Sequence, residues 1–142
     1  MLEQYLPNVN WERVWEATNQ TLYMTGISVV AVFILGIILG LILFLTSKGN
    51  IWENRLVYGI VGAYVNIFRS IPFIILIVLL IPFTKIIMGT MIGEKAALPA
   101  LIIGTAPFYA RMVEIALREI DKGVIEAARA MGAKTSTIIW KV

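Results

Sequence analysis

The sequence predicts an all-α integral membrane protein built as a helical bundle, and three observations lead to that fold class. Of the 142 residues, 59% are hydrophobic and 15% are charged, whereas soluble domains carry about 25% charged residues. Three stretches are long and apolar enough to cross a bilayer, which takes about 20 residues each. Cysteine and histidine are absent, which excludes disulfides, thiolate metal sites and histidine-based acid–base catalysis.

Residues 1–20 are predicted to form an amphipathic leader on the extracytoplasmic side. Asn10 is suited to cap the start of a helix. Trp11 and Trp15 follow on one helical face, and tryptophan favours the headgroup layer of a membrane. We therefore expect this leader to lie at the membrane surface.

Residues 21–46 are predicted to form the first membrane-spanning helix. No charged residue occurs between Ala17 and Ser47. The late start and the acidic leader exclude a cleaved signal peptide. Gly36 and Gly40 form a GxxxG pair, which favours close approach of another helix.

Residues 56–84 are predicted to form the second spanning helix, with a kink near Pro72. Asn66, Arg69 and Ser70 belong to a small-and-polar stripe on this helix. A charge in hydrocarbon is costly, so such a stripe faces a bundle interior or a wet cavity. Asn66, Arg69, Ser70 and Pro72 are therefore the candidates for a translocation pathway or its kink. The alternative is structural, with Arg69 bonding carbonyls freed at the kink or pairing with a buried carboxylate.

Residues 96–118 are predicted to form the third spanning helix. Arg111, Glu114 and Arg118 lie on one face at spacings of three and four. Glu114 and Arg118 have the favourable order for an ion pair. We favour a structural ion-pair face over a substrate contact, because pairing and snorkelling near a helix end account for these charges.

Residues 121–142 are predicted to form short polar helices on the cytoplasmic side. A turn at Asp121 precedes an alanine-rich helix, and Gly132 suits the residue after its end. The last helical pattern has no terminator at Val142, which predicts that the chain continues. Lysine and arginine concentrate in this tail, so the positive-inside rule places it in the cytoplasm and the N-terminus outside. The basic residues of the tail are Arg118, Lys122, Arg129, Lys134 and Lys141.

Glu126, Ala127, Ala128 and Gly132 resemble the cytoplasmic signature of permease subunits of bacterial ABC importers, which is Glu-Ala-Ala, three residues and Gly. Longer runs are similar to one subfamily, the methionine-uptake permeases. These runs are Val65–Ile74, Ile81–Thr84 and Ala106–Glu114.

The resemblance implies a permease-type bundle with five spanning helices, three of them in these residues, and a location in the bacterial cytoplasmic (inner) membrane. It implies a homodimer of permease subunits, two cytoplasmic ATP-binding subunits and an extracytoplasmic substrate-binding protein. The segment from Glu126 to Gly132 would be the helix that couples to the ATPase. The chain itself would hydrolyse no ATP, bind no cofactor or metal, and contact the lipid bilayer but no nucleic acid.

Two alternatives stay open from the residues alone. A stand-alone channel or secondary carrier would use Arg69, Arg111 and Glu114 as an ion or proton path. Secondary carriers commonly contain repeated segments, and the three spans show no convincing repeat. A membrane scaffold would use the tail only to recruit a soluble partner.

Overall fold

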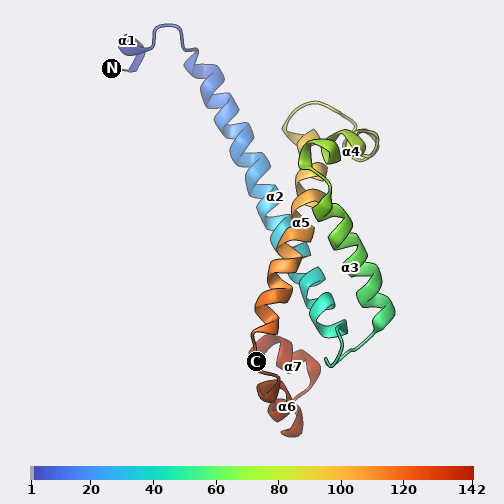
Figure 1. Cartoon of the computed structure of the whole chain (residues 1–142). Coiled ribbons are helices and arrows are strands. Elements are labelled where there is room, and N and C mark those ends of the chain that lie inside the picture. The colour runs from blue at the N-terminus through green and yellow to red at the C-terminus, as the bar shows by residue number, and fades with distance from the viewer. Residues whose placement is uncertain (1) are drawn as a thin grey trace.

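The computed structural model describes residues 2–142, and the described residues form helices without strands (Figure 1). Met1, the first residue of the predicted leader, lies outside them. By length and composition α2 and α5 each suffice to cross a membrane, and α3 with α4 pass the same test only together, as one broken span or as a re-entrant loop. The helices are α1 (Leu2–Tyr5), α2 (Trp11–Thr46), α3 (Arg55–Ser70), α4 (Phe73–Met88), α5 (Glu94–Arg118), α6 (Lys122–Ala130) and α7 (Thr135–Lys141).

Helix α2 differs from the prediction of a separate leader and span, because it runs unbroken for 36 residues. Asn10 caps it, and its side chain accepts a hydrogen bond from the Arg13 amide at 3.2 Å. No proline interrupts the helix between Trp11 and Thr46, so the leader continues directly into the span. At about 1.5 Å per residue such a helix exceeds the thickness of a bilayer core. Figure 1 shows its N-terminal part standing away from the other helices.

The predicted kink in the second span is in fact a break between two helices, α3 and α4, whose axes differ by 115°. Pro72 has no amide hydrogen to donate, and it forces Ile71 into an extended conformation with φ −83° and ψ 124°. The Pro72 carbonyl then accepts from the amides of Ile75 and Leu76 at 2.9 and 3.0 Å. Pro72 therefore ends one helix and starts the next.

Helix α5 is the central element, since α2, α3 and α4 all pack against it. Leu43, Val65 and Ala110 form a fully buried cluster that joins α2, α3 and α5. A second cluster joins α4 to α5 near Gly104. Its buried members are Leu76, Leu80 and Ala100.

The GxxxG pair lies where α2 crosses α5, as its small residues predicted. A Cβ added to Gly36 would collide with the ring of Tyr109. A Cβ added to Gly40 would lie 2.6 Å from Val113 Cβ and 2.8 Å from the Ala110 carbonyl oxygen. The two backbones approach so closely that only glycine fits at these positions.

Gly40→Val is expected to lower the free energy of unfolding by about 1–3 kcal/mol, because a side chain there overpacks the α2–α5 contact. An SDS titration of the purified protein, followed by circular dichroism, measures the loss. Gly26→Val is the matched control, since nothing lies within 4 Å of a Cβ at Gly26. Equal stability of the two variants would show that the close contact is absent.

Candidate functional site

Glu114 is a buried carboxylate held between two arginines of its own helix. Its exposed fraction is 1%. Arg111 pairs with Oε2 of Glu114. Arg118 donates to Oε1 from Nη2 at 2.8 Å and from Nε at 3.2 Å. The predicted ion-pair face of Arg111, Glu114 and Arg118 is thus a triad with both carboxylate oxygens occupied.

The triad extends across to α3. Arg111 Nη2 donates to Asn66 Oδ1 at 2.7 Å. The Tyr58 hydroxyl donates to Glu114 Oε1 at 3.3 Å and accepts from Arg118 Nη2 at 3.4 Å. These five side chains, here called the α3–α5 network, fix the facing sides of the two helices. Asn66, a pathway candidate from the sequence, is therefore joined to the ion-pair face.

Tyr58 is the member of the network that the sequence pattern missed. It lies four residues before Gly62 and eight before Asn66, so it continues the same helical face toward the start of α3. The signal for Tyr58 is therefore its place on that stripe, where any side chain that can form a hydrogen bond is a candidate, aromatic ones included.

The other pathway candidates, Ser70 and Arg69, lie at the break between α3 and α4, and their surroundings differ. The Ser70 hydroxyl donates to the Asn66 carbonyl at 2.7 Å, which satisfies a carbonyl at the end of α3. Arg69 is exposed, and among the described residues it has no ion pair or side-chain hydrogen bond. It borders a cavity of about 220 Å³ together with residues of α3, α4 and α5. The other residues lining this cavity are Phe68, Ile71, Phe73, Leu76, Gly104 and Phe108.

Neither structural alternative for Arg69 is realised in the described residues. The carboxylate within the bundle, Glu114, is taken by the other two arginines. A carbonyl at the end of α3 is taken by Ser70. Arg69 thus presents a positive charge to a cleft where the second span breaks.

Helix α6 and the two residues that follow it contain the segment Glu126–Gly132 singled out in the sequence. Asp121 caps it by accepting from the Gly123 amide at 2.9 Å. At its end Gly132 takes φ +85°, and the amides of Gly132 and Ala133 donate at 3.0 Å to Arg129 and Ala128 carbonyls. This pair of bonds is a Schellman motif, which needs a residue with positive φ at Gly132.

The outer face of α6 and α7 remains uncovered in the described chain. Glu126 and Ala127 are exposed, whereas Ala128 is buried. Met131 and Trp140 are 82% and 86% exposed. Figure 1 shows both helices at the end of the molecule opposite α4. Two large apolar side chains are thus exposed on this part of the chain, together with an exposed carboxylate.

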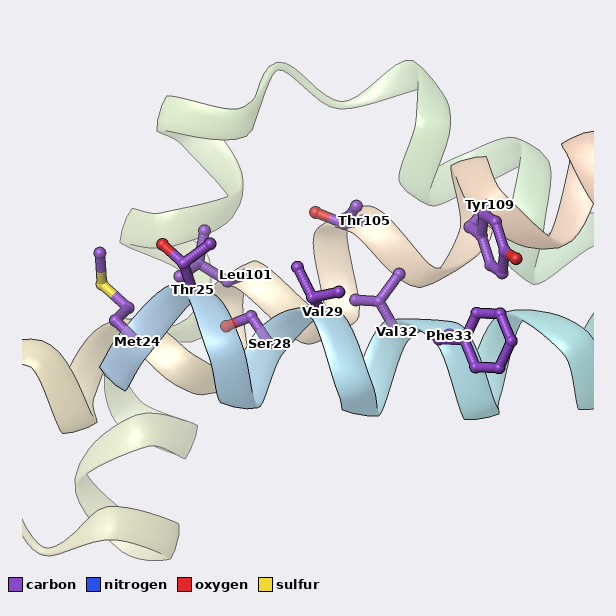
Figure 2. A pocket seen from close by; sticks show the side chains of 9 residues that line it. All are labelled: Met24, Thr25, Ser28, Val29, Val32, Phe33, Leu101, Thr105 and Tyr109. Carbon is purple, nitrogen blue, oxygen red and sulfur yellow. The ribbon is translucent and has the colours of Figure 1, made fainter. Parts of the chain in front are cut away.

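A third feature is an apolar cavity of about 350 Å³ between α2 and α5 (Figure 2). Figure 2 shows Met24 and Thr25 at one end and the rings of Phe33 and Tyr109 at the other, with centroids 6.0 Å apart. The Ser28 hydroxyl lines it, buried and without a hydrogen-bond partner in the described chain. Since no charged side chain lines this cavity, it does not suit the charged groups of an amino acid.

Comparison with known proteins gives consistent matches over most of the chain. Residues 33–142 match the family described as "Binding-protein-dependent transport system inner membrane component". All 142 residues align at 66% identity with the methionine import system permease protein MetP of Bacillus subtilis, of which they cover 64%. The D-methionine transport system permease protein MetI of Escherichia coli K12 is 54% identical over 129 residues, which are 91% of this chain and 58% of MetI.

A solved structure has the same fold. It is described as "Inward facing conformations of the MetNI methionine ABC transporter" and superposes with a TM-score of 0.88 at 49% sequence identity. The match covers 94% of this chain and 63% of the other. This chain therefore spans less than two thirds of the length of these relatives.

Glu114→Gln is expected to lower the free energy of unfolding by about 1.5–3 kcal/mol, because it removes the carboxylate that the largely buried Arg111 and the half-exposed Arg118 share. Thermal unfolding in detergent measures the change. Glu119→Gln, exposed one turn beyond Glu114, is the matched control and should change stability by less than about 0.5 kcal/mol. If Glu114→Gln unfolded at the same temperature as the wild-type protein, the α3–α5 network would not contribute to the stability of the fold.

Proposed function

Because the chain belongs to the family of binding-protein-dependent transport system inner membrane components, we propose that it forms the translocation pathway of an ATP-driven importer and couples that pathway to a separate ATPase. The observation that carries the proposal is α6, which lies beyond the end of α5, with Glu126 exposed on it and Met131 exposed directly after it. A helix in this place can bind a soluble subunit and remain joined to α5.

The proposed substrate is methionine. The support comes from the names of relatives at 54% and 66% identity, which are a D-methionine transport permease and a methionine import permease. Arg69 is the candidate within the described chain for guiding such a substrate, since its cation borders a cleft where α3 and α4 separate. A guanidinium there suits the carboxylate of an amino acid.

The proposed coupling contact is the segment Glu126–Gly132. Ala127 is small and exposed, so it allows a partner surface to approach the helix closely, whereas Ala128 is buried and packs α6 against the rest of the chain. Glu126 offers a carboxylate to a basic group on that surface. The Schellman motif at Gly132 fixes the direction in which α7 leaves α6, so the two helices present one defined shape.

The proposed assembly is a homodimer of this subunit with two ATP-binding subunits below it and an extracytoplasmic substrate-binding protein above it. The solved MetNI relative, described as an ABC transporter, supports the ATPase partner. The basic tail supports an inner-membrane orientation with α6 in the cytoplasm and the N-terminus outside. The chain itself is proposed to bind no cofactor and to leave ATP hydrolysis to its partner, since Gly132–Thr135 lacks the Gly-Lys-Ser/Thr order of a phosphate-binding loop.

The channel or carrier alternative is less well supported. It requires Arg111 and Glu114 to exchange ions or protons with a pathway. In the structure both oxygens of Glu114 are engaged and the residue is 1% exposed. A group held in this way suits a fixed cross-link between helices better than a mobile ion path.

Glu126→Lys is expected to separate ATP hydrolysis from uptake, because it reverses the charge that faces the ATPase. Co-purification of the ATPase, ATP hydrolysis by the complex and methionine uptake in proteoliposomes measure the effect, with uptake reduced about tenfold or more if a charged contact of roughly 1.5–3 kcal/mol is lost. Glu12→Lys makes the same charge change at the far end of α2 and should leave both intact. Normal uptake and normal ATPase binding by Glu126→Lys would refute the coupling role.

Arg69→Ala is expected to lower methionine uptake while the complex still assembles, because Arg69 makes no ion pair or side-chain hydrogen bond with the described residues. The loss should be about tenfold or more if one charged hydrogen bond to substrate is removed. Uptake and size-exclusion profiles of the assembled transporter are compared, with Lys85→Ala as a control cation elsewhere on the α3–α4 pair. Unchanged uptake by a stable Arg69→Ala complex would exclude the residue from the pathway.

A further inference from the structure

The turn between α2 and α3 contains a cleft that the proposed transport mechanism does not use. Its volume is about 330 Å³. Figure 1 shows this turn at the same end of the molecule as α6. The lining residues are Thr46, Lys48, Glu53, Arg55 and Tyr58.

The charges around the cleft are mostly positive. Lys48 and Arg55 are exposed, and neither has an ion-pair partner among the described residues. Lys122 of α6 adds a third cation, since its Nζ would lie 3.2 Å from a Cβ placed on Gly49. Glu53 is the one acidic residue lining the cleft, and its Oε2 accepts from the Gly49 amide at 3.2 Å.

The turn that carries these cations is held in place by the backbone. The Trp52 amide donates to the Leu45 carbonyl at 3.0 Å, and the Asn54 amide donates to the Thr46 carbonyl at 3.0 Å. Asn54 also caps α3 by accepting from the amides of Leu56 and Val57 at 3.1 Å. Because the turn is fixed to the end of α2, Lys48 and Arg55 are brought to the same cleft before any ligand arrives.

The depth of the cleft matches the headgroup layer of a bilayer. Thr46 is the last residue of the long apolar helix α2, and Arg55 is the first residue of α3. The cleft thus begins where the apolar part of both helices ends. Cations at this level lie beside lipid phosphates rather than beside lipid tails.

We propose that this cleft binds the phosphate headgroup of an anionic phospholipid. Arg55 has the planar donor geometry that recognises phosphate oxygens in pairs, and Lys48 and Lys122 add positive charge. The choice of an anionic lipid rests on the proposed orientation, which places this end in the cytoplasmic leaflet, where anionic lipids gather. Free phosphate shares the same chemistry, so the experiment separates the two sources.

Trp52 lies within this turn, and its side chain is 55% exposed, which makes it a reporter. In the assembled protein, every other tryptophan is replaced by phenylalanine, and the protein is reconstituted into phosphatidylcholine vesicles. Phosphatidylglycerol or phosphatidylcholine brominated near the headgroup then quenches the fluorescence of Trp52. We expect a relative association constant of about 5 or more in favour of phosphatidylglycerol, since each nearby cation contributes about fivefold.

Lys48→Gln with Arg55→Gln should lower this preference about fivefold or more although Lys122 remains, whereas Lys48→Arg with Arg55→Lys should keep most of it. The matched control is Lys85→Gln with Lys95→Gln. It removes the same charge far from the cleft, near the last residue of α4 and the first residue of α5. Equal quenching of the wild-type protein by the two lipids, or a preference that is undiminished in Lys48→Gln with Arg55→Gln, would overturn the proposal. The assay is repeated in inorganic phosphate and in chloride at the same ionic strength. Loss of the lipid preference in phosphate alone would assign the cleft to free phosphate and overturn the proposal that a lipid is its ligand.

The quenching assay needs neither ATP nor substrate. Failure of the lipid site would therefore leave uptake and ATPase binding untouched. Failure of the importer function would leave the lipid preference in place.

Discussion

Glu114 is the residue on which the arrangement of the helices depends. A carboxylate that is 1% exposed in an apolar bundle is tolerated only when it is paired and hydrogen-bonded. Arg111 and Arg118 supply the charge, and Tyr58 and Asn66 extend the contact to α3. Because these partners come from two helices, the need to pair the Glu114 carboxylate holds α3 against α5. Through Tyr58 the carboxylate also joins the first turn of α3, next to the cationic turn, to α5.

Two glycines of α2 at its crossing with α5 supply the second constraint. Gly36 and Gly40 of α2 meet Tyr109, Ala110 and Val113 of α5 at distances that leave no room for a Cβ. In lipid the hydrophobic effect does not draw helices together, so such close packing has to stabilise the crossing. Because α5 is the middle helix, this contact and the α3–α5 network act on the same element from two sides.

The sequence predicts much of this arrangement because its strongest signals are local. Hydropathy identifies the spans, the GxxxG pair indicates a crossing, and the spacing of Arg111, Glu114 and Arg118 predicts their pairing. The angle at Pro72 does not follow from the sequence, since a proline permits either a kink or a full break and packing against α5 decides between them. The link from Asn66 to Arg111 is also hidden, because it joins residues 45 positions apart and depends on the register of two helices.

The short connection between α5 and α6 gives the proposed coupling a physical route. The amides of Glu119 and Ile120 donate to carbonyls of the last turn of α5, and Asp121 directly caps α6. With no flexible linker between them, a displacement of α6 moves the end of α5, where Arg118 holds Glu114. The α3–α5 network then carries the displacement into α3. Helix α3 ends at the Ile71–Pro72 break, which lacks a continuous helical hydrogen-bond ladder, so in the proposed importer the motion is absorbed there, beside Arg69.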